Sequence, residues 1–82
     1  MSPEATARVR LYSKPGCHLC DQAREVIAAV CAELEERFDE VDISTSPDLT
    51  RQFGEEIPVT FVDGVQHDFW RVDPARLAAA LA

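Results

Sequence analysis

Two cysteines separated by two residues, Cys17 and Cys20, lie where the sequence changes from a strand pattern to a helix pattern. Residues 8–13 alternate between polar and apolar, which predicts a strand that ends at Pro15-Gly16. Over residues 18–37 an apolar stripe recurs at helical spacing. The stripe consists of Leu19, Ala23, Val26, Ile27, Val30 and Leu34. We therefore expect both thiols at a helix N-terminus, where unpaired N–H groups and the helix dipole favour negative charge.

The rest of the chain predicts five further elements. They are a strand over residues 38–43, a short helix over 47–53 capped by Ser46, strands over 59–62 and 65–70 joined by Asp63-Gly64, and a last helix that begins at Asp73-Pro74. The order β-α-β-α-β-β-α predicts an α/β fold, with a four-stranded mixed sheet flanked by helices. The first two strands should pair in parallel through a right-handed crossover, and the tight turn makes the last two antiparallel.

The length and composition indicate one small domain. The chain has 82 residues, of which 46% are hydrophobic, and we expect a flexible tail over residues 1–7 and a single domain over residues 8–82. The N-terminal segment lacks the basic and apolar regions of a signal peptide, and no apolar run is long enough to span a bilayer. The net charge of −7 disfavours nucleic-acid binding. We expect a cytoplasmic monomer with no membrane partner.

A close cysteine pair in a reducing compartment is more often catalytic or metal-binding than structural. At positions i and i+3 the side chains of Cys17 and Cys20 lie on one helix face, so a disulfide between them is feasible. We assign Cys17 as the nucleophile and Cys20, one turn into the helix, as the thiol that resolves the mixed disulfide. Lys14 and His18 could add positive charge beside Cys17, and each is also explained as an ordinary exposed side chain.

The sequence also allows other uses of the cysteine pair. A zinc site would need further ligands at suitable spacing, and His67 stands alone. Cys31 falls on the buried side of the predicted helix, where we expect it to be a small apolar filler. An iron–sulfur cluster with Cys17 donated by each of two chains is an alternative, and so is a partner-binding module without turnover.

The motifs resemble those of a glutaredoxin-type member of the thioredoxin superfamily over nearly the whole chain. The matching segments are Tyr12-Ser13-Lys14-Pro15-Gly16-Cys17-x-x-Cys20, the helix after it, Ile57-Pro58-Val59 and Phe61-Val62-Asp63-Gly64. The Cys-His-Leu-Cys form resembles a group of small bacterial glutaredoxin-like proteins. The resemblance implies a thioredoxin/glutaredoxin-like fold and a thiol–disulfide oxidoreductase of cell redox homeostasis, with no bound cofactor. It also implies that Pro58 is cis and lies against the two cysteines, while Ile57 offers its backbone to a bound peptide or to glutathione.

The resemblance further implies protein disulfide substrates, with a thioredoxin-reductase-like enzyme or glutathione as the reductant. The sequence departs from the glutathione-binding pattern at several places. Glu56 stands where typical glutaredoxins carry Thr, and residues 67–73 lack their Gly pair. Arg71 and Val72 occupy the places of the acidic pair that would hold the ammonium of glutathione. We predict weak glutathione-coupled activity. Trp70, in the same stretch, is interpreted either as a cover for the site or as packing between the last strand and the last helix.

Overall fold

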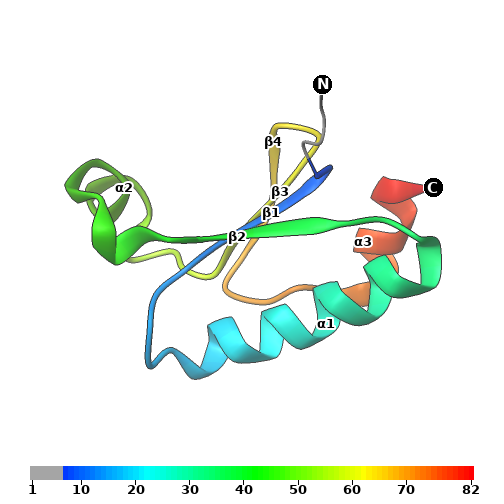
Figure 1. Cartoon of the computed structure of the whole chain (residues 1–82), viewed down its shortest axis with the longest axis horizontal. Coiled ribbons are helices and arrows are strands. Elements are labelled where there is room, and N and C mark those ends of the chain that lie inside the picture. Colours follow the sequence, from blue (N-terminus) through cyan, green and yellow to red (C-terminus); the bar gives the residue numbers. More distant parts are fainter. Residues whose placement is uncertain (1–6) are drawn as a thin grey trace.

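A four-stranded mixed sheet flanked by helices forms the frame of the molecule (Figure 1). The computed structural model describes residues 7–82. Its elements are β1 (Val9–Ser13), α1 (His18–Leu34), β2 (Phe38–Asp42), the 3₁₀ turn η1 (Ile43–Thr45), α2 (Pro47–Phe53), β3 (Val59–Val62), β4 (Val65–Phe69) and α3 (Pro74–Leu81). This order confirms the predicted α/β fold. The predicted tail over residues 1–7 lies, apart from Ala7, outside the described residues.

The strands lie in the order β2-β1-β3-β4. β1 pairs in parallel with β2, as expected for strands joined by the α1 crossover, and β3 pairs antiparallel with both β1 and β4. The β3–β4 turn is Asp63-Gly64, with φ values of 52° and 83°. Two successive left-handed residues match the right-handed twist of the flanking strands, which confirms the predicted hairpin. β1 is therefore an inner strand, and its C-terminal end leads directly into the thiol motif.

Side-chain caps begin two of the helices where the sequence predicts them. The Ser46 hydroxyl accepts a hydrogen bond from the Leu49 amide (3.2 Å) at the start of α2. The Asp73 carboxylate accepts one from the Ala75 amide (2.9 Å) at the start of α3. Each cap is followed by a proline at the first helical position, where its missing N–H costs nothing.

The ends of α1 and α2 differ from the expectation. α1 ends at Leu34, three residues before the predicted end, because Glu35 adopts a left-handed conformation (φ 58°) and its N–H bonds back to Ala32 (3.3 Å). Gly54 does follow α2, but with a right-handed φ of −56°. A Cβ at Gly54 would lie 2.4 Å from the carbonyl oxygen of Thr50, so close backbone approach explains this glycine.

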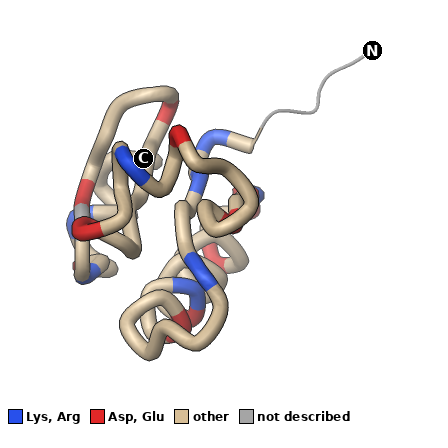
Figure 2. The backbone as a smooth tube through the Cα atoms, turned by 90° about the vertical axis from the view of Figure 1, so that its left-hand side faces the viewer, with Lys and Arg blue, Asp and Glu red and all other residues tan. Residues whose placement is uncertain are grey.

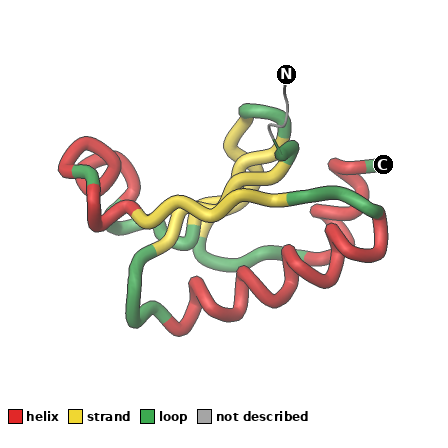
Figure 3. The backbone as a smooth tube through the Cα atoms, viewed as in Figure 1, coloured by secondary structure: helices red, strands yellow, loops and turns green. Residues whose placement is uncertain are grey.

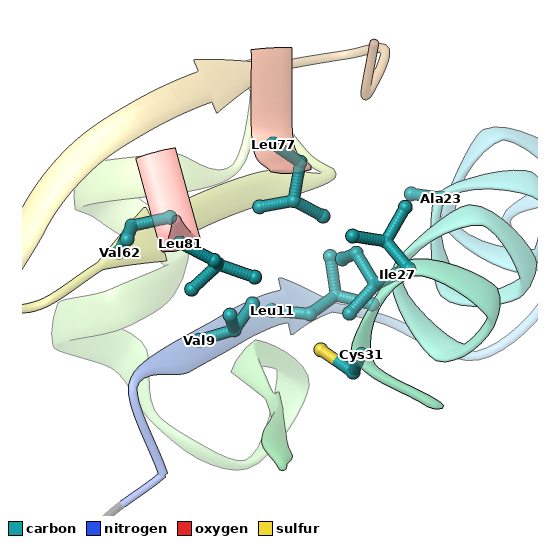
Figure 4. Packing of buried hydrophobic residues seen from close by; sticks show 9 residues of the cluster. Val9, Leu11, Ala23, Ile27, Cys31, Val62, Leu77 and Leu81 are labelled. Atoms are coloured by element: carbon teal, nitrogen blue, oxygen red, sulfur yellow. The ribbon is translucent and has the colours of Figure 1, made fainter. Parts of the chain in front are cut away.

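One face of the sheet is covered by α1 and α3, which lie side by side (Figure 1). Buried residues of β1, β3, α1 and α3 interlock there, as Figure 4 shows; they include Val9, Leu11, Ile27, Val62, Leu77 and Leu81. Cys31 is 2% exposed within this group, which confirms its predicted role as an apolar filler. The predicted stripe is wrong at its two ends, because Leu19 and Leu34 are 37% and 39% exposed. They lie in the first and last turns of α1, whereas the middle of the helix faces the sheet.

α2 lies apart from α1 and α3, beyond the end of the sheet where β2 stops (Figure 3). Its Phe53 ring stacks on Tyr12 (4.7 Å between ring centroids), and both meet Phe61 edge-on. A second group of buried residues surrounds these rings and consists of Cys20, Ile43, Phe53, Ile57 and Val59. The resolving thiol thus belongs to this second group. Across residues 7–82 no helix combines the length and apolar character needed to cross a bilayer.

Candidate active site

Cys17 is the N-cap residue of α1. Its backbone is extended (φ −101°, ψ 111°), and its Sγ accepts a hydrogen bond from the Cys20 amide at 3.2 Å. A cysteine here takes the place that Ser, Thr, Asp or Asn usually holds at a helix start. The sulfur therefore faces the unpaired amides of the first turn, an environment that stabilises an anion.

Cys20 lies on the same turn but in a different environment. It is fully buried, whereas Cys17 is half-buried, and both are free thiols. Burial, together with the hydrogen bond to Cys17, raises the pKa of Cys20 to about 11. The backbone amide of Lys14 and the charge of Arg24 act on this pKa in the opposite direction. The two thiols are thus distinguished by exposure, as the sequence predicts for a nucleophile and a resolving thiol.

The connector between α2 and β3 completes the wall of the site. Ile57 is packed in the same buried group as Cys20, and Cys17 packs against that group. The Ile57–Pro58 peptide bond is cis, as the resemblance implies. The Pro58 carbonyl accepts a hydrogen bond from the Trp70 amide at 2.7 Å. The fold therefore brings together Cys17, Cys20 and Ile57 from segments that are 37 residues apart in the sequence.

The side chains of Lys14 and His18 are both exposed, and neither makes a hydrogen bond or ion pair within the described part of the chain. His18 is the first residue of α1, beside Cys17. Lys14 reaches the site through its backbone amide, which contacts the Cys20 sulfur. The charge effects predicted for these two side chains stay predictions.

Trp70 lies beside the α2–β3 connector. Its indole Nε1 donates to the carbonyl of Glu55 (3.1 Å), and its side chain is 52% exposed. It borders a groove of about 160 Å³ whose walls are Leu19, Gln22, Ala23, Val26, Trp70, Arg71 and Val72. The groove runs from the thiol motif, through Leu19, to the segment before α3. Trp70 also borders a second cavity with Asp68 of β4 and Arg76 of α3, so it lies between these elements while half of its surface stays exposed.

A charged network beside Cys20 was not predicted. Arg24 of α1 binds Glu40 of β2 through two hydrogen bonds (2.7 and 2.6 Å) and Asp21 through a third (2.8 Å). Glu40 also accepts from the buried Ser13 hydroxyl at 2.6 Å. The spacing of Arg24, four residues after Cys20, was the available signal in the sequence. Figure 2 shows basic and acidic positions interspersed along the backbone.

The third cysteine does not join the pair. Cys31 belongs to the buried group between the sheet, α1 and α3 (Figure 4), whereas Cys20 belongs to the second buried group and Cys17 packs against it. Within residues 7–82 no three or more His, Cys, Asp or Glu side chains are grouped to hold a metal ion.

Comparison with known proteins identifies the family of this chain. The model of the family described as Glutaredoxin-like domain (DUF836) matches residues 8–82. An uncharacterized Mycobacterium tuberculosis protein, Rv0508, is 37% identical over an alignment that covers 92% of this chain and 82% of the relative. The crystal structure of protein XcR50 from X. campestris superposes with a TM-score of 0.75 at 34% identity and covers 89% of this chain and 93% of that one.

Two more distant structures show the same fold. Protein Ne2328 from Nitrosomonas europaea has a TM-score of 0.78 at 21% identity, with both chains fully covered. A mutant thioredoxin from Halobacterium salinarum has a TM-score of 0.60 at 18% identity and covers 87% of this chain and 67% of its own. The family match over residues 8–82 shows that this chain, which has the fold of thioredoxin, belongs to the glutaredoxin-like (DUF836) family.

Proposed function

We propose that this protein is a thiol–disulfide oxidoreductase that reduces disulfides of protein substrates by a dithiol mechanism. The observation that carries the proposal is the contrast between the two thiols. The Cys17 sulfur caps α1 and faces its free amides, while Cys20, one turn further on, is fully buried. A helix N-terminus stabilises a thiolate, and the thiolate is the nucleophile in disulfide exchange.

The reaction proceeds in two exchanges. The Cys17 thiolate attacks one sulfur of the substrate disulfide; a new S–S bond forms, the substrate bond breaks, and its electron pair leaves on the released substrate sulfur. Cys20 then gives its proton to solvent and attacks the Cys17 sulfur. The Cys17–Cys20 disulfide forms, and the substrate departs with both of its cysteines reduced. A thiol reductant restores the two cysteines by the same chemistry.

The pKa of Cys20 supports this division of roles. With a pKa of about 11, Cys20 is almost entirely protonated at neutral pH. Cys20 therefore remains a protonated thiol while the Cys17 thiolate attacks the substrate disulfide. It becomes a nucleophile only within the mixed disulfide, where the Cys17 sulfur is held one helical turn away.

The groove beside the site favours a protein substrate over glutathione. Arg71, on the groove wall, has an exposed guanidinium that forms no ion pair with the described residues. A cation at this position would repel the ammonium group of glutathione. We therefore propose protein disulfides as substrates, with a thioredoxin-reductase-like enzyme as the reductant and glutathione as the weaker donor.

Insulin-disulfide reduction tests the proposed activity. Cys17→Ser should abolish turnover, and Cys20→Ser should leave a mixed disulfide on Cys17 that mass spectrometry detects. Cys31→Ala is the matched control, because Cys31 is buried away from the pair, and it should keep turnover within about twofold. Turnover by the Cys17→Ser variant would refute the proposal. Supplying a thioredoxin reductase or the glutathione system in turn then identifies the better reductant.

A further inference from the structure

Three side chains from three elements form a fixed link beside the resolving thiol. The Ser13 hydroxyl, at the end of β1, donates to Glu40 Oε2 at 2.6 Å. Glu40 accepts two parallel hydrogen bonds from Arg24 of α1, at 2.7 Å on Oε1 and 2.6 Å on Oε2. A guanidinium held by such a fork has a defined position, unlike a single-contact surface pair.

The link lies on the side of the sheet that carries α1. Glu40 is paired across the sheet with Leu11, which is fully buried beneath α1, so the Glu40 side chain points to the same side. Arg24 is four residues after Cys20 and therefore occupies the same helix face, one turn further on. The fork thus fixes the Arg24 charge on the helix face that bears Cys20.

The surroundings of Cys20 contain few other charges. The titratable or charged groups that line the adjoining pocket or lie next to Cys20 are Tyr12 of β1, Lys14 and Cys17 of the connecting loop, His18, Asp21 and Arg24 of α1, and Glu40 and Asp42 of β2. The side chains that reach Cys20 from η1, α2, the connector and β3 are apolar: Ile43, Phe53, Ile57 and Val59. Arg24 is the cation whose charge acts on Cys20, and it favours the thiolate.

We propose that Arg24 is a positioning residue for the second exchange of the reaction: held by Glu40, it keeps one positive charge beside Cys20 and stabilises the thiolate that attacks the Cys17 mixed disulfide. The proposal rests on the dithiol function proposed above. Glu40 has two effects, since it fixes the guanidinium and, together with Asp21, which accepts from Arg24 at 2.8 Å, offsets part of its charge. In this step the Cys20 proton goes to solvent, the Cys17–Cys20 bond forms, and the bond from Cys17 to the substrate sulfur breaks with its electron pair on the leaving sulfur.

The two exchanges can be timed separately with dithiodipyridine, an uncharged aromatic disulfide. Attack by Cys17 releases a first equivalent of thiopyridone, and attack by Cys20 on the resulting mixed disulfide releases a second. Stopped-flow absorbance of the reduced protein, recorded from about pH 6 to pH 9, gives the rate of each phase. Because the reagent is uncharged, an effect of Arg24 on either rate does not come from electrostatic attraction of the reagent to Arg24.

Arg24→Gln should slow the second phase relative to the first. Loss of the Arg24 charge raises the pKa of Cys20 and so lowers the thiolate fraction, the accompanying gain in nucleophilicity offsets part of this loss, and we expect a net decrease in rate of about twofold. Between pH 6 and pH 9, below the pKa of Cys20, the log rate of the second phase rises with pH, and the Arg24→Gln line should lie below the wild-type line throughout by the same twofold factor. Arg24→Lys, which keeps the charge without the fork, should restore most of the rate.

Glu40→Gln should change the rate of the second phase in the opposite direction. The amide still accepts from Arg24 but no longer offsets its charge, so the second phase should become about twofold faster throughout this pH range. Arg51→Gln is the matched control, because Arg51 pairs with Asp48 on α2 in a similar exposed arrangement. It should leave both phases unchanged.

The proposal is overturned if Arg24→Gln and Glu40→Gln move the second phase in the same direction, or if neither moves it. If the contact between Arg24 and Glu40 only stabilised the fold, one of those two results would be observed, because both substitutions would weaken the same contact. Failure of the underlying function looks different: the wild-type protein itself would release only one equivalent and form no Cys17–Cys20 disulfide.

Discussion

At the residue scale, Cys17 combines two roles that are usually filled by different side chains. Its sulfur closes the N-terminus of α1 by accepting the Cys20 amide, and the same sulfur is the proposed nucleophile. The amide that stabilises the helix start is therefore also a donor to the developing thiolate. The same hydrogen bond therefore contributes to the stability of α1 and to the reactivity of Cys17, and substitutions at Cys17 can separate the two effects.

Cys17→Ser should keep the N-cap of α1, because serine is among the best N-cap residues. It should lose the disulfide exchange proposed for the Cys17 thiolate. We expect a free energy of unfolding within about 0.5 kcal/mol of the wild-type value, whereas Cys17→Ala should lose about 1 kcal/mol. Urea denaturation of the reduced proteins, followed by far-UV circular dichroism, measures both. Equal stability of the Ser and Ala variants would show that the sulfur does not act as a cap.

At the scale of helices and strands, α3 depends on a cap at its start and on burial along its length. Asp73 accepts from the amides of Ala75 (2.9 Å) and Arg76 (3.3 Å), and Leu77 and Leu81 fill the space above β1 and β3. The helix has only eight residues, too few to be stable alone. By holding the start of α3, the Asp73 cap also helps to fix the residues just before α3, which form part of the groove wall.

Asp73→Ala should destabilise the protein by about 1 kcal/mol, because two amides at the start of α3 lose their acceptor. Asp73→Asn is the matched control, since asparagine caps a helix as well as aspartate does, and it should stay within about 0.5 kcal/mol of the wild type. Urea midpoints at constant slope give both values. An unchanged midpoint for Asp73→Ala would mean that the packing of Leu77 and Leu81 alone holds α3.

The local elements were predictable because their signals are contained in a few adjacent residues. Asp63-Gly64, Ser46 and Asp73 each predict a turn or cap from backbone preference alone, and the structure has all three. The end of α1 was not predictable, since Glu35 carries no strong left-handed preference. The link of Ser13, Glu40 and Arg24 depends on the approach of three elements, and no local pattern encodes it.

At the scale of the whole molecule, Arg8 joins segments from both ends of the chain. Its guanidinium binds the Asp63 carboxylate through two hydrogen bonds (both 2.9 Å), the Glu36 carboxylate at 2.8 Å and the Leu81 carbonyl at 3.1 Å. One residue before β1 thus connects the β3–β4 turn, the segment after α1 and the end of α3. In a domain this small, a contact shared by four segments supports the cooperativity of folding.

This contact predicts a dependence of stability on pH. The hydrogen bonds from Arg8 lower the pKa of Asp63 from its ordinary value of 3.8. A carboxyl whose folded-state pKa is lowered stabilises the native state above its unfolded pKa, and that contribution is lost as the pH falls through the folded value. Arg8→Gln should therefore lower the urea midpoint at pH 7, and the gap from wild type should shrink below about pH 4. Arg51→Gln should open no comparable gap, because Arg51 and Asp48 form a single and more exposed pair, whereas Arg8 binds Asp63 through two hydrogen bonds and also binds Glu36. A gap independent of pH would show that Arg8 acts through packing and its bond to Leu81 instead of through charge.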